Sequence, residues 1–151
     1  WEGDTIVGAR HKGAVLTIVD RKSGYTLLGG LPKREALPLS AQAIRLLNSV
    51  PHVKTLTLDN GKEFAKHAKI KAGTNADIYF AHPYSSWERG TNENTNGLIR
   101  QYLPKSKRLD NVTEQELAFI MFRLNHRPRK RLGYRTPHEV FFEEQSVALE
   151  T

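Results

Sequence analysis

Three acidic residues in this sequence have the types and surroundings expected of a metal site. Asp4 lies in WEGDTIVG and Asp59 in LTLDNGKEF, each within or directly after an apolar, strand-like run, and Glu93 lies on a predicted helix in SSWERGTNENTNGLIRQY. Carboxylate oxygens are the hard ligands that Mg²⁺ and Mn²⁺ accept in proteins. Two such ions held side by side promote in-line displacement at phosphorus. The three acids therefore suggest phosphodiester chemistry.

Each acid taken alone has an ordinary structural explanation. Asp59-Asn60-Gly61 is a common turn after a strand, although the carboxyl end of a strand is also where α/β sheets place ligands. Asp4 could simply face water from its strand, and Glu93 could be a solvated helix residue. It is the combination of the three that favours a shared site.

Length, charge and the missing cysteines narrow the class of protein. The chain has 151 residues, which suits one domain, and a net charge of +7. A positive field attracts polyanions, so nucleic acid is the first partner to consider, with a basic, solvated surface as the alternative. The absence of Cys excludes disulfides and thiolate metal sites. No apolar run approaches the roughly 20 residues of a membrane helix, so no membrane partner is expected.

Apolar periodicity predicts an α/β fold with a mixed, five-stranded sheet. Strands are predicted at 4–8, 14–20, 25–31, 53–58 and 78–81, the first three forming an antiparallel meander. Helices are predicted at 38–48 with Pro38 at the first helical position, at 63–71 closed by Gly73, and at 86–103 after a capping box from Ser85 to Glu88. Further capping boxes at Thr113 and Thr136 open two more helices. The helical crossovers return the later strands in parallel.

Three stretches together resemble the catalytic domain of DDE transposases and retroviral-type integrases. They are LTLDNGKEF, HPYSSWERGTNENTNGLIRQYLP and NHRPRKRLGYRTPHEVF, and they are similar in particular to bacterial insertion-sequence transposases of the IS-thirty family. The resemblance runs from Trp1 to about Glu144. Thirty-three residues separate Asp59 from Glu93, the interval that this family shows between its second and third acids. Arg100 matches the basic residue that the family carries one heptad after the glutamate.

The resemblance implies an RNase H-like fold of the retroviral integrase type in which Asp4, Asp59 and Glu93 are the catalytic and metal-binding residues. It further implies two Mg²⁺ or Mn²⁺ ions, and metal-dependent phosphodiester hydrolysis and strand transfer at insertion-sequence ends. The expected partners are DNA, as terminal inverted repeats and target, and further copies of the protein in the full-length active complex. The expected location is the bacterial cytoplasm, with the nucleoid when the protein is bound to DNA.

The same resemblance suggests how the chain is divided. Residues 1–144 would form the catalytic core and residues 145–151 a flexible C-terminal tail. The N-terminal helix-turn-helix region that reads DNA sequence in this family is expected to be absent from this chain.

Basic and amide residues around the acids are candidate DNA contacts. Arg89, Glu93, Asn96 and Arg100 share one face of the predicted helix, which fits either contacts to DNA or a plain surface ladder of charges. Asn92, Asn94 and Asn96 are poor helix formers, so they predict polar contacts outside the helix, with a frayed helix start as the alternative. The cationic stretch that follows is a candidate clamp on the DNA backbone or a solvated loop; its candidate residues are Arg127, Arg129, Lys130 and Arg131.

Four other residues lie near the acids in the sequence or in the predicted fold, and three of them keep two interpretations each. His82 could touch substrate or be a loop histidine, and Trp87 could stack on a base but favours a core position. Glu2 is interpreted as structural or solvated, although strand alternation places it on the face of Asp4. Glu63 is interpreted as a first-turn helix residue.

Two other functions fit the same fold. A ribonuclease H or junction resolvase would use similar carboxylates and metals, but the Asp59–Glu93 interval argues against it. A non-catalytic DNA-binding module is the other alternative, against which the presence of all three expected acids counts.

Overall fold

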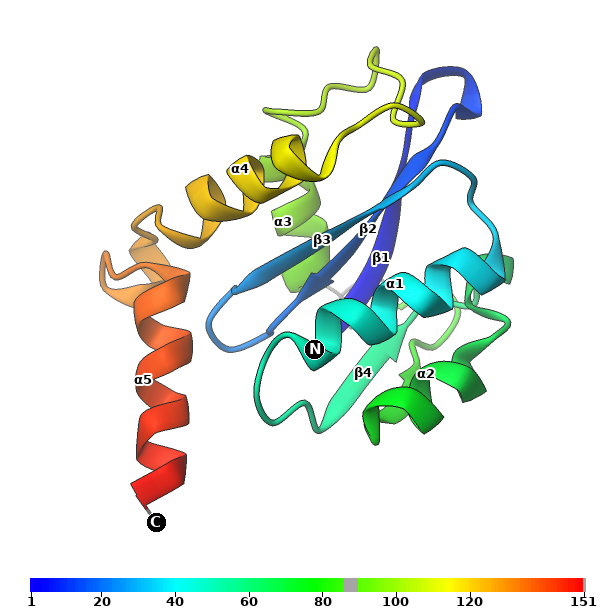
Figure 1. Ribbon diagram of the computed structural model, residues 1–151. Helices are drawn as coiled ribbons and strands as arrows, with labels where there is room; N and C mark the ends of the chain where they lie inside the picture. Colours follow the sequence, from blue (N-terminus) through cyan, green and yellow to red (C-terminus); the bar gives the residue numbers. More distant parts are fainter. Residues whose placement is uncertain (86–89, 151) are drawn as a thin grey trace.

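The computed structural model describes residues 1–85 and 90–150, the last six by their backbone alone (Figure 1). Its sheet has five strands, which are β1 (Glu2–Val7), β2 (Ala14–Val19), β3 (Thr26–Leu31), β4 (Thr55–Leu58) and β5 (Asp77–Phe80). Their order across the sheet is β3-β2-β1-β4-β5. The strand β1 is therefore central, and the mixed sheet predicted from the sequence is confirmed.

The pairing follows the predicted topology. β1, β2 and β3 pair antiparallel, whereas β4 pairs parallel with β1 and β5 pairs parallel with β4. The parallel strands are reached through helical crossovers, which are α1 (Ala36–Asn48) and α2 (His67–Thr74). β2 is buried along its whole length, as a strand covered on both faces must be.

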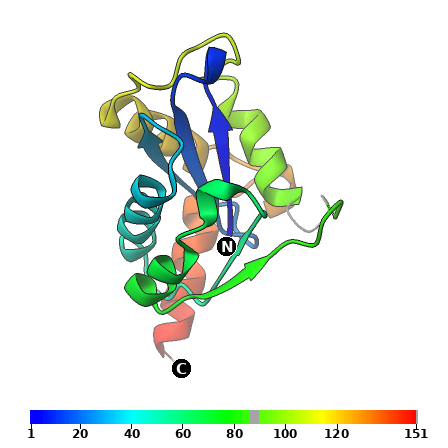
Figure 2. The same cartoon turned by 90° about the vertical axis from the view of Figure 1, so that its right-hand side faces the viewer.

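Helices cover both faces of the sheet, as the edge-on view in Figure 2 shows for α1 and α2 on one face and α3 on the other. α1 buries Leu39, Ala43, Leu46 and Leu47 against one face, in a core that also includes Phe64 and Ile70. The other face carries a second core, to which α3 (Gly90–Ile99) and α4 (Glu114–Asn125) contribute Ile99, Leu117, Ile120 and Leu124. The last helix is α5 (Pro137–Glu150), whose Phe141 stacks on Tyr25.

Several helix boundaries differ from the sequence prediction. α1 begins at Ala36, so Pro38 is its third residue and not its first. A proline is tolerated there because the first four N–H groups of a helix have no intrahelical acceptor. The predicted helix at 63–71 is a 3₁₀ turn (Lys62–Phe64) followed by α2, and α2 is closed by Asn75 at φ 58° and not by Gly73. Gly73 lies inside α2, where a Cβ would come within 2.9 Å of Ile44 on α1.

The predicted starts of α4 and α5 are confirmed. Thr113 Oγ1 accepts the Glu116 N–H at 3.1 Å, and at α5 the Thr136 hydroxyl and the Glu139 carboxylate each accept the other residue's backbone N–H. The backbone of α5 runs to Glu150, into the stretch for which the sequence suggests a tail. The capping box at Ser85–Glu88 lies outside the described residues, and α3 ends at Ile99, four residues before the predicted end. No helix in the described part of the chain has the length and apolar character to span a bilayer.

Candidate active site

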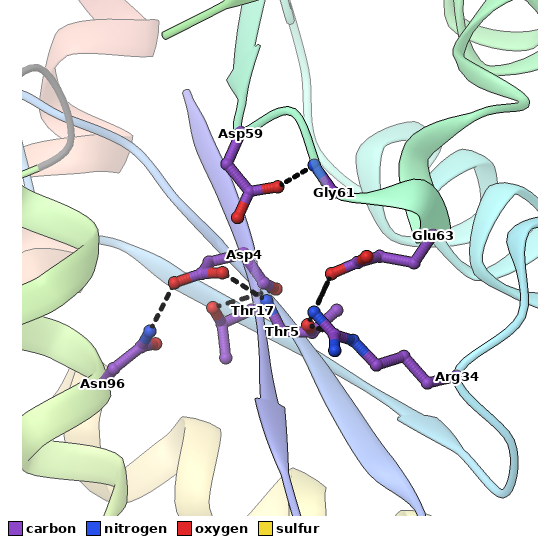
Figure 3. A network of polar contacts seen from close by, with 8 residues as sticks. All are labelled: Asp4, Thr5, Thr17, Arg34, Asp59, Gly61, Glu63 and Asn96. Carbon is purple, nitrogen blue, oxygen red and sulfur yellow. Dashed lines mark hydrogen bonds and ion pairs between the residues drawn. The ribbon is translucent and has the colours of Figure 1, made fainter. Parts of the chain in front are cut away.

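Asp4 and Asp59 lie next to each other at the centre of the sheet. Glu2 on β1 is in register with Thr57 on β4, and because the two strands run parallel, the same register two residues further places Asp59 beside Asp4. Neighbouring strands are about 4.8 Å apart, and alternation points both side chains to the face that α3 covers. Figure 3 shows the Asp59 carboxylate directed toward Asp4. Folding thus brings together two acids that lie 55 positions apart in the sequence.

The turn after β4 fixes the orientation of the Asp59 carboxylate. Asp59 Oδ1 accepts the Gly61 N–H at 2.8 Å, which is the local bond that an aspartate commonly makes after a strand. A Cβ added to Gly61 would lie 2.4 Å from Glu63 Oε2 and 2.8 Å from Asp59 Oδ1. A larger residue here would therefore displace one of the two carboxylates, whereas the backbone angles make no demand for glycine, since φ is −63°.

The helix α3 reaches Asp4 through an asparagine one turn after Glu93. Asn96 Nδ2 donates to Asp4 Oδ2 at 3.0 Å, and Asp4 Oδ1 accepts the Thr5 N–H at 2.8 Å. Asn92 is fully buried and also contacts β1. The predicted polar contacts of the asparagines are thus confirmed for Asn92 and Asn96, whereas Asn94 is exposed.

Glu93 is exposed in the first turn of α3, three residues before Asn96. Among the side chains of residues 1–85 and 90–144, no three acidic or histidine groups lie closely enough together to hold one metal ion. The structure therefore places Asp4 and Asp59 together and Glu93 on the adjoining helix, without a closed three-carboxylate cluster in the part of the chain it describes.

Glu63 is a buried carboxylate in the first turn of the 3₁₀ helix Lys62–Phe64, as the sequence predicted, with partners that the sequence does not reveal. Its side chain is 5% exposed, and Oε1 accepts from Thr5 Oγ1 at 3.1 Å and pairs with Arg34 Nη2. Arg34 Nε also donates to Thr5 Oγ1 at 3.1 Å. This bond closes a three-residue network on the side of β1 away from Asn96 (Figure 3). This network neutralises the charge of Glu63 inside the protein. The sequence gives no sign of it, since Arg34 comes from the loop after β3.

The donor set at the centre of the sheet suits a hard divalent cation. Asp4 and Asp59 offer carboxylate oxygens and no softer ligand, which is the chemistry that Mg²⁺ and Mn²⁺ prefer. Two negative charges on neighbouring strand positions repel each other, and a cation between them relieves that repulsion. The residues that the structure brings together therefore fit such an ion, with Glu93 as the additional carboxylate nearest along α3.

Most of the predicted DNA-contacting arginines donate hydrogen bonds within the protein. Arg100 donates to the carbonyls of Leu103 (3.3 Å) and Val7 (3.0 Å), so it ties the end of α3 to the end of β1. Burial lowers the pKa of its guanidinium, since desolvation disfavours the charged form. These bonds give Arg100 a structural role, while its contact with DNA stays a prediction.

The basic loop after α4 is similarly anchored. Arg127 donates to Gln101 Oε1, Arg129 to the Leu124 carbonyl and Arg131 to the Lys22 carbonyl, and Lys130 is exposed. Burial lowers the pKa of Arg129, and the positive charges of Arg127 and Arg131 lower it further. A cluster in which cations repel one another is an electrostatic match for a polyanion. The remaining candidate, Arg89, lies outside the described residues, as does Trp87.

His82 is exposed and lines a shallow cleft of about 260 Å³ beside Asp59. Asn60, Ala81 and Tyr84 line the same cleft, and Asn60 Nδ2 donates to the Ala81 carbonyl at 3.1 Å. The histidine is therefore a neighbour of the predicted site, and both of its interpretations from the sequence remain open.

This arrangement of strands and helices defines an RNase H-like fold of the integrase type. The catalytic core domain of bovine immunodeficiency virus integrase superposes with a TM-score of 0.75 at 22% sequence identity, covering 99% of this chain and 97% of that one. A chain of the simian T-cell lymphotropic virus intasome, solved with a PP2A regulatory subunit, matches with a TM-score of 0.69 at 19% identity over 83% of this chain and 48% of that one. No family model matches the sequence.

The relatives found by sequence narrow the family further than the fold does. Over nearly its whole length the chain is homologous to part of the transposases of IS30-type insertion sequences. It is 52% identical to the transposase for element IS4351 of Bacteroides fragilis and 42% identical to transposase InsI for element IS30A of Escherichia coli K12. It is 45% identical to the transposase for element IS1086 of Cupriavidus metallidurans. The chain spans less than half the length of these relatives, namely 46%, 39% and 42%.

Proposed function

We propose that this chain is the catalytic domain of an insertion-sequence transposase, which hydrolyses phosphodiesters and transfers DNA strands at the ends of its element with the help of divalent metal ions. The observation that carries the proposal is the pairing of Asp4 with Asp59 beside a helix that carries Glu93. The similarity to transposases over 97–99% of the chain supports the same assignment.

Each side chain has a part that its position allows. Asp4 and Asp59 would hold Mg²⁺ or Mn²⁺, and Glu93 would add a carboxylate from α3. Bound ions of this kind neutralise charge on the phosphate and generate a nucleophile at neutral pH. Asn96 orients Asp4 through its 3.0 Å hydrogen bond, and the Gly61 N–H orients Asp59. The cationic residues Arg127, Arg129, Lys130 and Arg131 hold the DNA backbone.

A branched DNA with the structure of the strand-transfer product can test this proposal. Such a substrate does not depend on a separate domain that reads the DNA sequence. Because a transesterification is reversible, a catalytic domain should resolve such a branch by the reverse reaction. We expect the wild-type chain to do so in Mn²⁺ or Mg²⁺ and not in EDTA. Asp4→Asn, Asp59→Asn and Glu93→Gln should each lose the activity.

A matched control separates loss of chemistry from loss of charge. Asp77→Asn removes one negative charge from the exposed edge strand β5, and it should leave the rate unchanged. A wild-type chain inactive on branched DNA but active on RNA–DNA hybrids would indicate a ribonuclease H instead. A wild-type chain that binds DNA and is inactive on both would indicate a non-catalytic module.

A further inference from the structure

Glu2 is a fully buried carboxylate that the proposed chemistry does not use. It is 0% exposed and lies two residues before Asp4 on the same face of β1. Its Oε2 accepts the backbone N–H of Asn92 at 2.7 Å, and its Oε1 is paired with Arg21 Nε at 3.0 Å. A carboxylate is buried at this depth only where such partners offset its lost hydration. The N–H that it accepts belongs to the start of α3, where a negative charge also suits the helix dipole.

The side chain of Asn92 adds further contacts between α3 and the sheet. It is 0% exposed, and its Nδ2 lies within 3.4 Å of the Glu2 carbonyl and 3.3 Å of Thr17 Oγ1 on β2. Its Oδ1 is buried with no hydrogen-bond partner among the described residues. A buried, unsatisfied oxygen lowers stability and so offsets part of what the two Nδ2 contacts contribute.

The spacing of α3 matches the spacing of β1. Asn92 contacts Glu2, and Asn96, four residues later on the helix, contacts Asp4, two residues later on the strand. Four helical residues rise about 6 Å, and two strand residues rise about 6.6 Å. Two contacts in step fix both the position of the helix along the strand and its rotation about its own axis. Glu93 lies between them, so its direction is set by the same pair of contacts.

We infer that Glu2 and Asn92 are positioning residues that clamp the first turn of α3 to β1 and β2 and thereby hold Glu93 toward the Asp4–Asp59 pair. This inference rests on the proposed function, because Glu93 must act as a metal ligand for its position to matter. Residues that orient metal ligands typically change metal affinity by about 10–100-fold when they are lost.

The test compares two substitutions at Glu2 with a destabilised control. Glu2→Gln keeps an oxygen that can accept the Asn92 N–H, whereas Glu2→Leu removes both the acceptor and the charge. Leu47→Ala opens a cavity on α1, on the opposite face of the sheet, and controls for lost stability. Two readouts are taken on the chain without DNA: hydrogen exchange of the α3 amides in the absence of metal, and Mn²⁺ affinity by calorimetric titration.

The expected order of Mn²⁺ affinity is wild type, then Glu2→Gln, then Glu2→Leu, with about a tenfold loss or more for the last. The hydrogen-exchange rate of the Asn92 backbone amide should be higher in Glu2→Leu than in wild type, and in Glu2→Gln it should lie closer to the wild-type rate. Leu47→Ala should show wild-type Mn²⁺ affinity. If Glu2→Leu does not fold, Asn92→Leu replaces it. That change keeps the backbone N–H that Glu2 accepts but removes the Nδ2 contacts to the Glu2 carbonyl and Thr17 Oγ1, together with the unsatisfied Oδ1, so Mn²⁺ should bind more weakly.

The outcomes distinguish the inference from the function on which it rests. A wild-type chain that does not bind Mn²⁺ would overturn the proposed metal site and the inference with it. A wild-type chain that binds Mn²⁺ while Glu2→Leu and Asn92→Leu bind it within twofold of wild type would overturn the clamp alone and leave the proposed function standing.

Discussion

Asn96 on α3 and Asp4 on β1 are joined by a 3.0 Å hydrogen bond from Nδ2 to Oδ2. The bond links the central strand to the helix that carries Glu93. It occupies one oxygen of the Asp4 carboxylate, which is a metal ligand in the proposed function. An amide at position 96 therefore has two effects, since it orients Asp4 and adds no negative charge to a site that already holds two aspartates.

Changing Asn96 to Asp should reveal the second effect. The variant loses the hydrogen bond and places a like charge beside Asp4, so the metal-free chain should lose roughly 1.5–3 kcal/mol of unfolding free energy. Saturating Mn²⁺ should restore more stability in this variant than in wild type, because the cation relieves a larger repulsion. Thermal melting with and without Mn²⁺ measures both. Asn94→Asp, on the exposed side of the same helix, should change neither.

Changing Asp59 to Asn should remove the stabilisation that metal gives to the wild-type chain. At a free Mn²⁺ concentration 100 times Kd, a single site adds about 2.7 kcal/mol, which corresponds to roughly 5–10 °C in Tm for a domain of this size. The Asp59→Asn variant should melt at the same temperature with and without Mn²⁺. An undiminished metal-induced rise in this variant would contradict the assignment of Asp59.

Local patterns in the sequence were enough to predict the sheet but not the surroundings of the site. β1, β2 and β4 follow from short runs of β-branched and apolar residues, and the start of α4 follows from a capping box, because these signals lie within a few neighbouring positions. Asp4 and Asp59 were identified through the resemblance to a family, since no local pattern says that two acids 55 positions apart are neighbours.

The parts that could not be predicted depend on distant partners. The burial of Glu63 depends on Arg34, which comes from the loop after β3. The choice between a structural and a solvated Glu2 depends on α3, which packs on β1 some 90 residues later. Helix boundaries were missed where sequence rules allow more than one solution, as at Pro38, which is tolerated anywhere in the first turn.

Two glycine-to-alanine changes should have opposite consequences. In Gly61→Ala the new methyl group would meet Glu63 Oε2 and Asp59 Oδ1, so we expect a loss of roughly 1–3 kcal/mol and a weaker Mn²⁺ site. In Gly97→Ala the methyl group meets nothing within 4 Å on helix α3, so stability should rise by roughly 0.5–1 kcal/mol with Mn²⁺ affinity unchanged. Denaturant unfolding and calorimetry check the pair. Equal effects of the two changes on metal binding would contradict the crowding at Gly61.

The Arg34–Glu63 pair should be strongly coupled. Arg34→Met leaves the Glu63 carboxylate buried with Thr5 Oγ1 as its remaining partner in the part of the chain that the structure describes. Removing one member of a buried pair typically lowers stability by about 3–5 kcal/mol. Because the Arg34 side chain is 44% exposed, water should reduce that to roughly 1–3 kcal/mol. In the double variant with Glu63→Gln the loss should be smaller than the sum of the two single losses. Additive losses in the double-mutant cycle would show that the network is not a unit.

The basic loop after α4 should determine how DNA binding depends on salt. Each phosphate contact contributes about 0.9 to the slope of log K against log salt concentration, so replacing Arg129, Lys130 and Arg131 by Gln should lower the magnitude of that slope by up to about 2.7. The control replaces Lys66, Lys69 and Lys71, three exposed cations at or on α2, and so removes the same charge from another face. Fluorescence anisotropy with a labelled duplex at several salt concentrations measures the slopes. If both triple variants lower the slope equally, the chain attracts DNA through its net charge of +7 and not through this loop.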